Sequence, residues 1–301
     1  MPESTIVSVI VCTYNREKYI GQTLEHLERQ QADPAQFEVL VVNNNSQDNS
    51  QSIIDQYVAR QDHFFSFLEL NQGHTYARNR GIREAKGQIL SFIDDDAFVD
   101  ENFVTELIRF FNAYPDASAL GGKIVPQYEE AEPAWMSKFL LPLVAALDKG
   151  NNVMKFKGNK YPIGANMAFR KEVFETFGEF DVNLGRRGEC LEGGDEKDVF
   201  ARLRKANRPV YYNPKVWVHH IIPPKRTTMT YIKGLANGVG TSEKKRIGSG
   251  LGARLGKVYE ELIKVGASCL LFFLYLLTGK KAAAFMIIRF RYWVIQGYLS
   301  K

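Results

Sequence analysis

The 301-residue sequence predicts an α/β protein with a mostly parallel central sheet flanked by helices. Short apolar, β-branched runs alternate with segments whose apolar residues recur every three or four positions, the pattern of strands followed by amphipathic helices. Each run ends in polar residues, as expected where the carboxyl ends of parallel strands border a ligand crevice. The composition, 45% hydrophobic and 24% charged, is typical of a globular protein and excludes a disordered chain or a disulfide scaffold.

Four strand–helix repeats are expected in the first 113 residues. In the first helix, for example, Ile20, Leu24 and Leu27 share one face. The expected strands are Ile6–Cys12, Phe37–Val42, Phe65–Leu70 and Ile89–Ile93, and the expected helices are Tyr19–Gln30, Ser50–Ala59, Tyr76–Ala85 and Glu101–Ala113.

The rest of the chain is less regular. We expect strands near Ser118–Ile124, Pro209–Tyr212 and Val216–His219, helices at Phe169–Phe177 and Lys197–Ala206, and an irregular stretch from about Gln127 to Arg187. Beyond Pro223-Pro224 the sequence becomes basic and Gly-rich and then strongly apolar. This change predicts a first domain over residues 1–225 and a helical C-terminal extension over residues 226–301.

Charge divides the chain in the same place. From Lys225 onward there are 14 Lys and Arg against three acids, a net charge of +11, whereas residues 1–224 carry a net charge of −6. The three cysteines, Cys12, Cys190 and Cys269, lie far apart and fit a reducing compartment. The N-terminus lacks a basic region before its apolar run, so it predicts a first strand and no export signal.

Two acidic clusters are candidate sites. Asp94, Asp95 and Asp96 directly follow an expected strand, and a divalent cation such as Mg²⁺ or Mn²⁺ would relieve their repulsion; a solvated turn is the alternative. Their position at a strand's carboxyl end favours the metal. The second cluster, Asp195 and Glu196, opens a helix, where the acids are either caps or a general base.

Three further features leave alternatives open. The side-chain amides around Asn43 suit either a base edge or a turn, and Arg78 lies on a helix face that would meet either a diphosphate or solvent. His220 ends the last expected strand and is either structural or a metal ligand.

Taken together, an ordered series of motifs resembles the family 2 glycosyltransferases over roughly residues 6–220. The motifs are SVIVCTYNR, VVNNNSQDNS, ARNRGIREAKGQILSFIDDDAF, GANMAFRKEVFETFGEFD, GGDEKDVFARL and YYNPKVWVHH. The resemblance implies the Rossmann-like GT-A fold, a nucleotide-sugar donor and transfer with inversion at the anomeric carbon.

The resemblance also implies roles for individual residues. Thr13, Tyr14 and Asn15 would line the nucleoside pocket, and Asn43 stands where the family commonly has an Asp that reads uracil. Arg78 would lie near the donor phosphates or base.

The acidic turn takes the place of the family's metal motif. Asp94 and Asp96 would bind Mn²⁺ or Mg²⁺, Asp94 and Asp95 would also lie near the donor nucleotide, and His220 would touch the metal or the diphosphate.

The family's GEDxDL reads GDEKDV here, so the acid pair is reversed. We expect Glu196 to be the catalytic base, with Asp195 as a close second. Gly164 and Asn166 match the segment beneath the sugar and acceptor. Acceptor contacts are further expected in the irregular stretch, from Trp135, Tyr161, Arg186 and Arg187.

The implied function is transfer of a sugar, from a UDP-sugar by preference, to a hydroxyl of a glycan or lipid-linked acceptor in surface polysaccharide or glycoconjugate biosynthesis. The changes at Asn43 and at Asp195-Glu196 leave an alternative, a nucleotide-sugar-binding scaffold with little activity. A dinucleotide-dependent oxidoreductase would need a GxGxxG turn where Thr13-Tyr14-Asn15-Arg16 stands.

The C-terminal extension predicts a membrane-surface element. Val265–Leu277 has 13 residues, fewer than the roughly 20 that span a bilayer, and Ala282–Leu299 is apolar apart from Arg289, Arg291 and Gln296. We expect helices lying on an anionic membrane surface, and a cytoplasmic protein held peripherally at the inner face of the plasma membrane. The alternative is packing on the first domain or a homodimer contact. No nucleic-acid motif accompanies the basic residues, so no nucleic-acid partner is expected.

Overall fold

The computed structural model describes residues 6–186, 193–247 and 251–300. The chain divides into two compact units. The first takes in Met1–Gln127, Ala145–Asn183 and Asp195–Ile221, and the second takes in Tyr128–Val144, Leu184–Gly194 and Ile222–Lys301. Arg187 and Cys190, both named from the sequence, lie outside the described residues.

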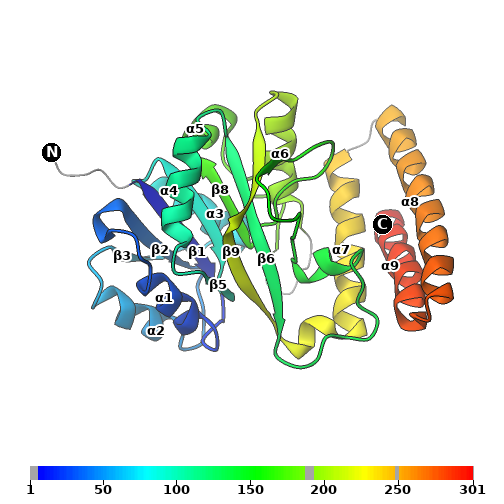
Figure 1. The fold of residues 1–301 in the computed structure, drawn as a ribbon, viewed down its shortest axis with the longest axis horizontal. Coiled ribbons are helices and arrows are strands. Elements are labelled where there is room, and N and C mark those ends of the chain that lie inside the picture. The colour runs from blue at the N-terminus through cyan, green and yellow to red at the C-terminus, as the bar shows by residue number, and fades with distance from the viewer. Residues whose placement is uncertain (1–5, 187–192, 248–250, 301) are drawn as a thin grey trace. The chain divides into compact units, whose positions relative to one another are not determined.

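A nine-stranded sheet forms the centre of the first unit (Figure 1). Its strands run in the order β3-β2-β1-β4-β8-β6-β9-β5, and β7 also pairs with β9. The strands are β1 (Val7–Thr13), β2 (Phe37–Asn43), β3 (Phe64–Leu68), β4 (Ile89–Asp94), β5 (Ala97–Val99), β6 (Ala119–Tyr128), β7 (Met154–Lys155), β8 (Asn166–Arg170) and β9 (Val210–Ile222).

The sheet is mixed, whereas the sequence predicts a mostly parallel one. Strands β3, β2, β1 and β4 are parallel, as strand–helix repeats require. Strand β8 then pairs antiparallel with both β4 and β6, and β5 and β7 pair antiparallel with β9. The reason is that β8 is reached through the long irregular stretch, which returns the chain in the opposite direction without a crossover helix.

Helices cover both faces of the sheet, because alternate residues of each strand point to opposite sides. On one face α1 (Ile20–Glu28), α2 (Ser50–Val58) and α4 (Phe103–Ala113) pack on residues such as Val9 and Val39. On the other face α3 (His74–Glu84), α5 (Glu172–Phe177) and α6 (Asp195–Lys205) pack on residues such as Ile10 and Leu40. Three single turns of 3₁₀ helix are η1 (Pro34–Gln36), η2 (Leu141–Val144) and η3 (Pro224–Thr227).

Two expectations for the second half of the sheet are wrong. The expected helix Phe169–Phe177 is a strand and a short helix, because Phe169 belongs to β8, which is buried between β4 and β6. The two expected strands around Pro214 are one continuous strand, β9. On the side of β9 that faces β5 and β7, β7 pairs with Tyr211 and Tyr212 and β5 pairs only from Val218, so Pro214 has no ladder partner on that side.

Three helices dominate the second unit: α7 (Met229–Ile247), α8 (Leu251–Leu277) and α9 (Lys281–Leu299). Helices α7 and α9 approach closely at glycines, since a Cβ on Gly240 would lie 2.1 Å from the Val294 carbonyl oxygen. Their apolar cluster includes Trp135, Leu140 and Ile232. Within residues 6–186, 193–247 and 251–300, no helix combines the length and apolar character needed to cross a bilayer.

Candidate active site

The expected crevice residues lie side by side at the carboxyl ends of the parallel strands. Thr13, the last residue of β1, is in register with Asn43, the last of β2. Cys12 is in register with Asp94, the last of β4. The strand ends therefore bring the proposed nucleoside loop, the Asn-rich turn and the acidic turn to one edge of the sheet.

Asp94, Asp96 and His220 form a candidate metal centre. One ligand atom from each lies within 4.8 Å of the others, and the described ranges of the chain contain no second group of three or more such residues. The His220 Nε2 is 3.0 Å from an oxygen of Asp96 and 3.8 Å from one of Asp94. Pairing of Ala97 with His220, across β5 and β9, positions the imidazole over the acidic turn. Two carboxylates and an imidazole are a donor set that fits a divalent cation.

Arg16 is a site residue that we did not expect from the sequence. Its guanidinium lies 3.5 Å from a carboxylate oxygen of Asp95 and 3.7 Å from one of Asp96. Burial raises the pKa of Asp95 to about 7, and the charge of Arg16 opposes that rise. Arg16 thus lies between Asp95 and Asp96, while Asp94 and Asp96 face His220. The sequence feature that could have indicated Arg16 as a site residue is its position directly after Thr13-Tyr14-Asn15.

Hydrogen bonds join the loops that follow β1 and β2. The Asn15 backbone N–H donates to the Ser46 hydroxyl, and the Gln47 backbone N–H donates to the Asn15 side-chain oxygen. Asn15 itself has a φ of 52°, a conformation that Asn tolerates better than most residues. Thr13 is buried, whereas the Tyr14 ring is 37% exposed and available to a ligand.

Asn43 and Asn44 build the turn after β2. The Asn43 side-chain oxygen accepts from the Ser46 N–H, and its amide donates to Gln51. Asn44 donates to the carbonyls of Glu69 and Asn71. The sequence left two roles open for Asn43, building a turn or contacting the edge of a base. The structure shows the turn-building role, and the contact with a base stays a proposal.

Arg78 pairs with the second acidic cluster. Its side chain is buried, one Nη1 donates to Asp195 at 2.6 Å, and the same nitrogen is 3.4 Å from Glu196. The sequence left open whether Arg78 faces a diphosphate or solvent. Because its side chain is buried, a solvent-facing role is excluded. The carboxylates come from the first turn of α6 and the arginine from α3.

The two carboxylates of this cluster differ in environment. Asp195 is nearly inaccessible, and burial together with the neighbouring Glu196 charge raises its pKa. The Glu196 side chain is 25% exposed, and although burial acts against it, the Arg78 charge and a hydrogen bond from Asp195 lower its pKa. Below about pH 7 a proton is thus held on Asp195 while Glu196 is ionised.

Gly164 lies against this cluster. A Cβ on Gly164 would lie 2.1 Å from the Glu196 carboxylate and 2.4 Å from Arg78, so any side chain there would displace these two groups. Two residues later, the Asn166 side chain donates to the carbonyls of Lys123 and Val216, across the sheet. Asn166 also pairs with Ile93, next to Asp94, and so connects the two acidic clusters through β8 and β4.

The expected acceptor residues are divided between the two units. Trp135 belongs to the second unit, where it packs in an apolar cluster with Leu140 and Ile232. Arg186 also belongs to the second unit. The Tyr161 ring stacks on Phe200 of α6 in the first unit.

Removing the Arg78 charge should destabilise the first unit. Arg78→Met leaves the buried Asp195 and the partly exposed Glu196 without their cation, and breaking a buried ion pair costs about 3–5 kcal/mol. We expect a loss of this size in the free energy of urea unfolding above pH 7, where Asp195 is ionised in the wild type. At the same pH the double variant Arg78→Met/Asp195→Asn should recover part of it, because residue 195 then carries no charge. A single variant within about 1 kcal/mol of the wild type would contradict this role, given that ordinary surface substitutions change stability by about 0.5 kcal/mol.

Comparisons with known proteins agree with this geometry. The model of the family described as Glycosyl transferase family 2 matches residues 8–178, more than half of the chain. The glucosyl-dolichyl phosphate glucuronosyltransferase of Haloferax volcanii is 28% identical over 230 residues, which cover 75% of this chain and 72% of that protein. The glycosyltransferase GlyG of Streptococcus pneumoniae is 32% identical over 225 residues, 72% of this chain and 71% of that protein.

Solved structures show the same fold. The mannosyltransferase PcManGT from Pyrobaculum calidifontis, in complex with GDP-Man and Mn²⁺, has a TM-score of 0.66 at 19% identity. The match covers 98% of this chain and 87% of the PcManGT chain. The TarS 1–349 structure from S. aureus in complex with UDP-GlcNAc has a TM-score of 0.56 at 18% identity and covers 82% and 68%. The resemblance seen in the sequence motifs is confirmed: the chain belongs to glycosyl transferase family 2 and is a glycosyltransferase with the GT-A fold.

Proposed function

We propose that this enzyme transfers a sugar, with inversion, from a nucleotide diphosphate sugar to a hydroxyl of a glycan or lipid-linked acceptor. The observation that carries the proposal is the presence in the first unit of two chemically different acidic clusters, one at the strand ends and one in the first turn of α6. Asp94, Asp96 and His220 offer metal ligands, while Glu196 lies beside Gly164 with a lowered pKa. Asn166 and β4 link the two clusters.

Asp94, Asp96 and His220 are the residues that would hold the cation. When bound, Mn²⁺ or Mg²⁺ supplies positive charge that stabilises a departing nucleoside diphosphate. A nitrogen ligand beside two carboxylates departs from the oxygen ligands that Mg²⁺ prefers, which favours Mn²⁺. The Mn²⁺ in the PcManGT complex supports the same choice.

Glu196 would act as the general base. Its lowered pKa keeps it ionised, so it can accept the proton of the acceptor hydroxyl as that oxygen attacks the anomeric carbon. The acceptor oxygen attacks the face opposite the leaving nucleoside diphosphate. The new bond to the anomeric carbon forms as the bond to the diphosphate oxygen breaks, and this single step inverts the configuration. Arg78 would position this carboxylate, and Asp195 would keep the arginine in place.

The donor and acceptor classes rest on relatives. Similar structures were solved in complex with UDP-GlcNAc and with GDP-Man. UDP is the proposed nucleotide, with Tyr14, Asn15 and Asn43 near the base, since the Asn43 oxygen still has acceptor capacity beyond its bond from Ser46. A glucosyl-dolichyl phosphate enzyme and the succinoglycan biosynthesis protein ExoM of Rhizobium meliloti support lipid-linked and polysaccharide acceptors.

A location at the cytoplasmic face of the plasma membrane is part of the proposal. It is supported by the net charge of +11 beyond residue 224. The second candidate function is a nucleotide-sugar-binding scaffold, which the exchanged order of Asp195 and Glu196 favours.

Thermal shift with a panel of UDP- and GDP-sugars, with and without Mn²⁺, tests the function. A donor at 100 times its Kd should stabilise the protein by about 2.7 kcal/mol, and only in the presence of Mn²⁺. Hydrolysis or transfer of the stabilising donor would then support the enzyme. Stabilisation without either reaction would support the scaffold, and a melting temperature unchanged by every donor would contradict both.

A further inference from the structure

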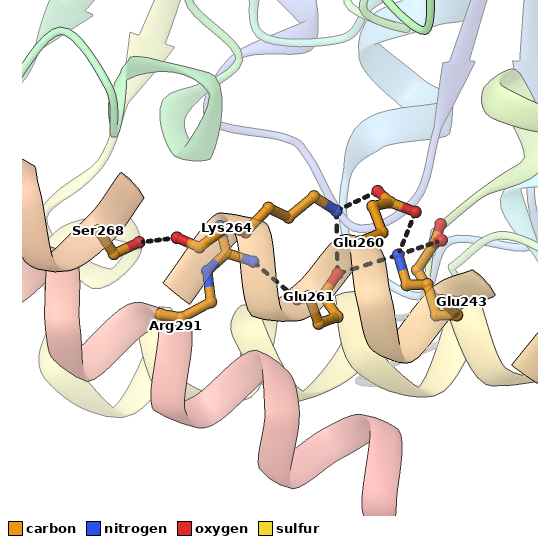
Figure 2. A network of polar contacts seen from close by, with 7 residues as sticks. Glu243, Glu260, Glu261, Lys264, Ser268 and Arg291 are labelled. Carbon is orange, nitrogen blue, oxygen red and sulfur yellow. Dashed lines mark hydrogen bonds and ion pairs between the residues drawn. The ribbon is translucent and has the colours of Figure 1, made fainter. Parts of the chain in front are cut away.

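Two charged residues of α8, Lys257 and Glu261, face its neighbouring helices, while Glu260 and Lys264 lie at the edge of this interface with side chains 46% and 37% exposed. Lys257 is buried, and its ammonium lies 3.0 Å from Glu243 of α7 and 3.0 Å from Glu261 of α8. Arg291 of α9 lies 3.0 Å from the other oxygen of Glu261, and Lys264 pairs with Glu261 at 2.9 Å and with Glu260. Figure 2 shows this network between the three helices.

The outward face of α8 is apolar over its described length. Its exposed positions recur at spacings of three and four, so they form one stripe along the helix. The large apolar side chains in the stripe are Leu255, Val258, Tyr259, Leu262, Ile263, Leu270, Phe273, Leu274 and Leu277, all at least 49% exposed. At 1.5 Å per residue the helix is about 40 Å long.

This arrangement is the reverse of the usual one. A helix on the surface of a water-soluble protein turns its apolar side inward and its charges outward. In α8 the buried Lys257 and Glu261 occupy the inside, while large apolar side chains such as Leu270 and Phe273 occupy the outside. A continuous exposed apolar stripe of this length indicates an interaction surface for a membrane or another protein.

Basic residues lie near the end of the stripe, in a part of the sequence that has no acidic residues. The sequence contains no Asp or Glu after Glu261, whereas Lys and Arg occur six times in that interval. Lys280 and Lys281 are exposed at the turn between α8 and α9, and Arg289 is exposed on α9. The Phe285 ring of α9, also exposed, packs on Phe272 and extends the apolar face towards this basic end.

We propose that the outward stripe of α8, with Phe285, Lys280 and Lys281, is a docking surface for an anionic lipid bilayer. The helix would lie in the plane of the interface with its leucines and phenylalanines in the acyl region and its lysines at the headgroups. A second copy of the chain fits the surface less well, because it would bring another set of lysines with no acids to meet them. The proposal deepens the membrane location proposed above by naming the surface that binds.

Vesicle co-sedimentation of the full chain tests this surface. We expect binding to vesicles of phosphatidylcholine with phosphatidylglycerol, and much weaker binding to phosphatidylcholine alone. Lys280→Gln/Lys281→Gln should weaken binding about 30-fold, the change for two basic residues near the surface. Phe273→Glu/Leu277→Glu should abolish it. The matched control, Leu70→Glu/Met154→Glu, changes exposed apolar residues of the first unit and should bind like the wild type.

Three results would overturn the proposal. The first is absence of wild-type binding to the anionic vesicles. The second is unchanged binding by Phe273→Glu/Leu277→Glu. The third is a wild-type dimer in analytical ultracentrifugation that this variant dissociates, because a second copy would then cover the stripe.

Donor binding with Mn²⁺, measured by thermal shift without vesicles, separates this proposal from the proposed function. The stripe variants should keep the wild-type response, because they leave the first unit unchanged. Lost vesicle binding with an intact donor response supports the docking surface. A wild type that binds vesicles but no donor contradicts the proposed function alone.

Discussion

Replacing Glu196 with Gln is expected to lower the turnover of sugar transfer about 10²–10⁴-fold, the usual contribution of a general base. Gln has the same shape and keeps the place beside Gly164, but it cannot accept the proton of the acceptor hydroxyl. Donor binding should persist, because the metal ligands come from β4, β9 and the turn after β4, whereas Glu196 belongs to α6. Steady-state transfer with saturating donor and Mn²⁺ measures the loss.

Asp195→Asn is the matched control for this prediction. Asp195 is nearly inaccessible and bonded to Arg78, so we expect a smaller loss of turnover together with reduced stability. The opposite ranking, with Asp195→Asn inactive and Glu196→Gln active, would make Asp195 the base.

The pH dependence distinguishes the two carboxylates independently. Each must be ionised to accept a proton, so turnover falls as the pH drops below the pKa of the base. Arg78 and the hydrogen bond from Asp195 lower the pKa of Glu196, so turnover through Glu196 should stay flat down to about pH 5. Burial raises the pKa of Asp195 to about 7, so turnover through Asp195 would fall about tenfold for each pH unit below that value.

Sequence reasoning found the parallel half of the fold because that half is local. Each of β1, β2 and β3 is followed by its own helix, and the hydrophobic pattern of each segment reports its structure. Strand β8 was missed because its apolar residues also fit a helical spacing, and only its neighbours β4 and β6 select the strand. Continuity of β9 past Pro214 likewise depends on where β5 and β7 end.

In the candidate site, too, some residues were predicted from the sequence and some contacts were not. Asp94, Asp96 and His220 were expected together from the family motifs, and the register of β5 with β9 brings them together. The pairing of Arg78 with Asp195, 117 positions apart, had no signal in the sequence. The inward charges of α8 were also invisible, because a helical sequence does not reveal which of its two faces meets the neighbouring helices.

Asp96→Ala is expected to abolish the response to Mn²⁺ and to lower turnover by at least about 10³-fold, since a metal ion contributes several kcal/mol of charge stabilisation. Asp96 is fully buried and lies 3.0 Å from His220, so its removal opens the centre of the cluster. Two readouts are needed: the rise in melting temperature on adding Mn²⁺ alone, and the transfer rate. Circular dichroism confirms that the variant is folded.

Neighbouring histidines on β9 provide a matched pair for the same centre. His220 faces the acidic turn, while His219 points to the other side of the strand, where its ring contacts Trp217. His220→Gln should therefore weaken the Mn²⁺ response, and His219→Gln should keep it. Equal responses from both variants would remove His220 from the ligand set, and an Asp96→Ala protein with wild-type activity in metal-free buffer would remove the metal from the reaction.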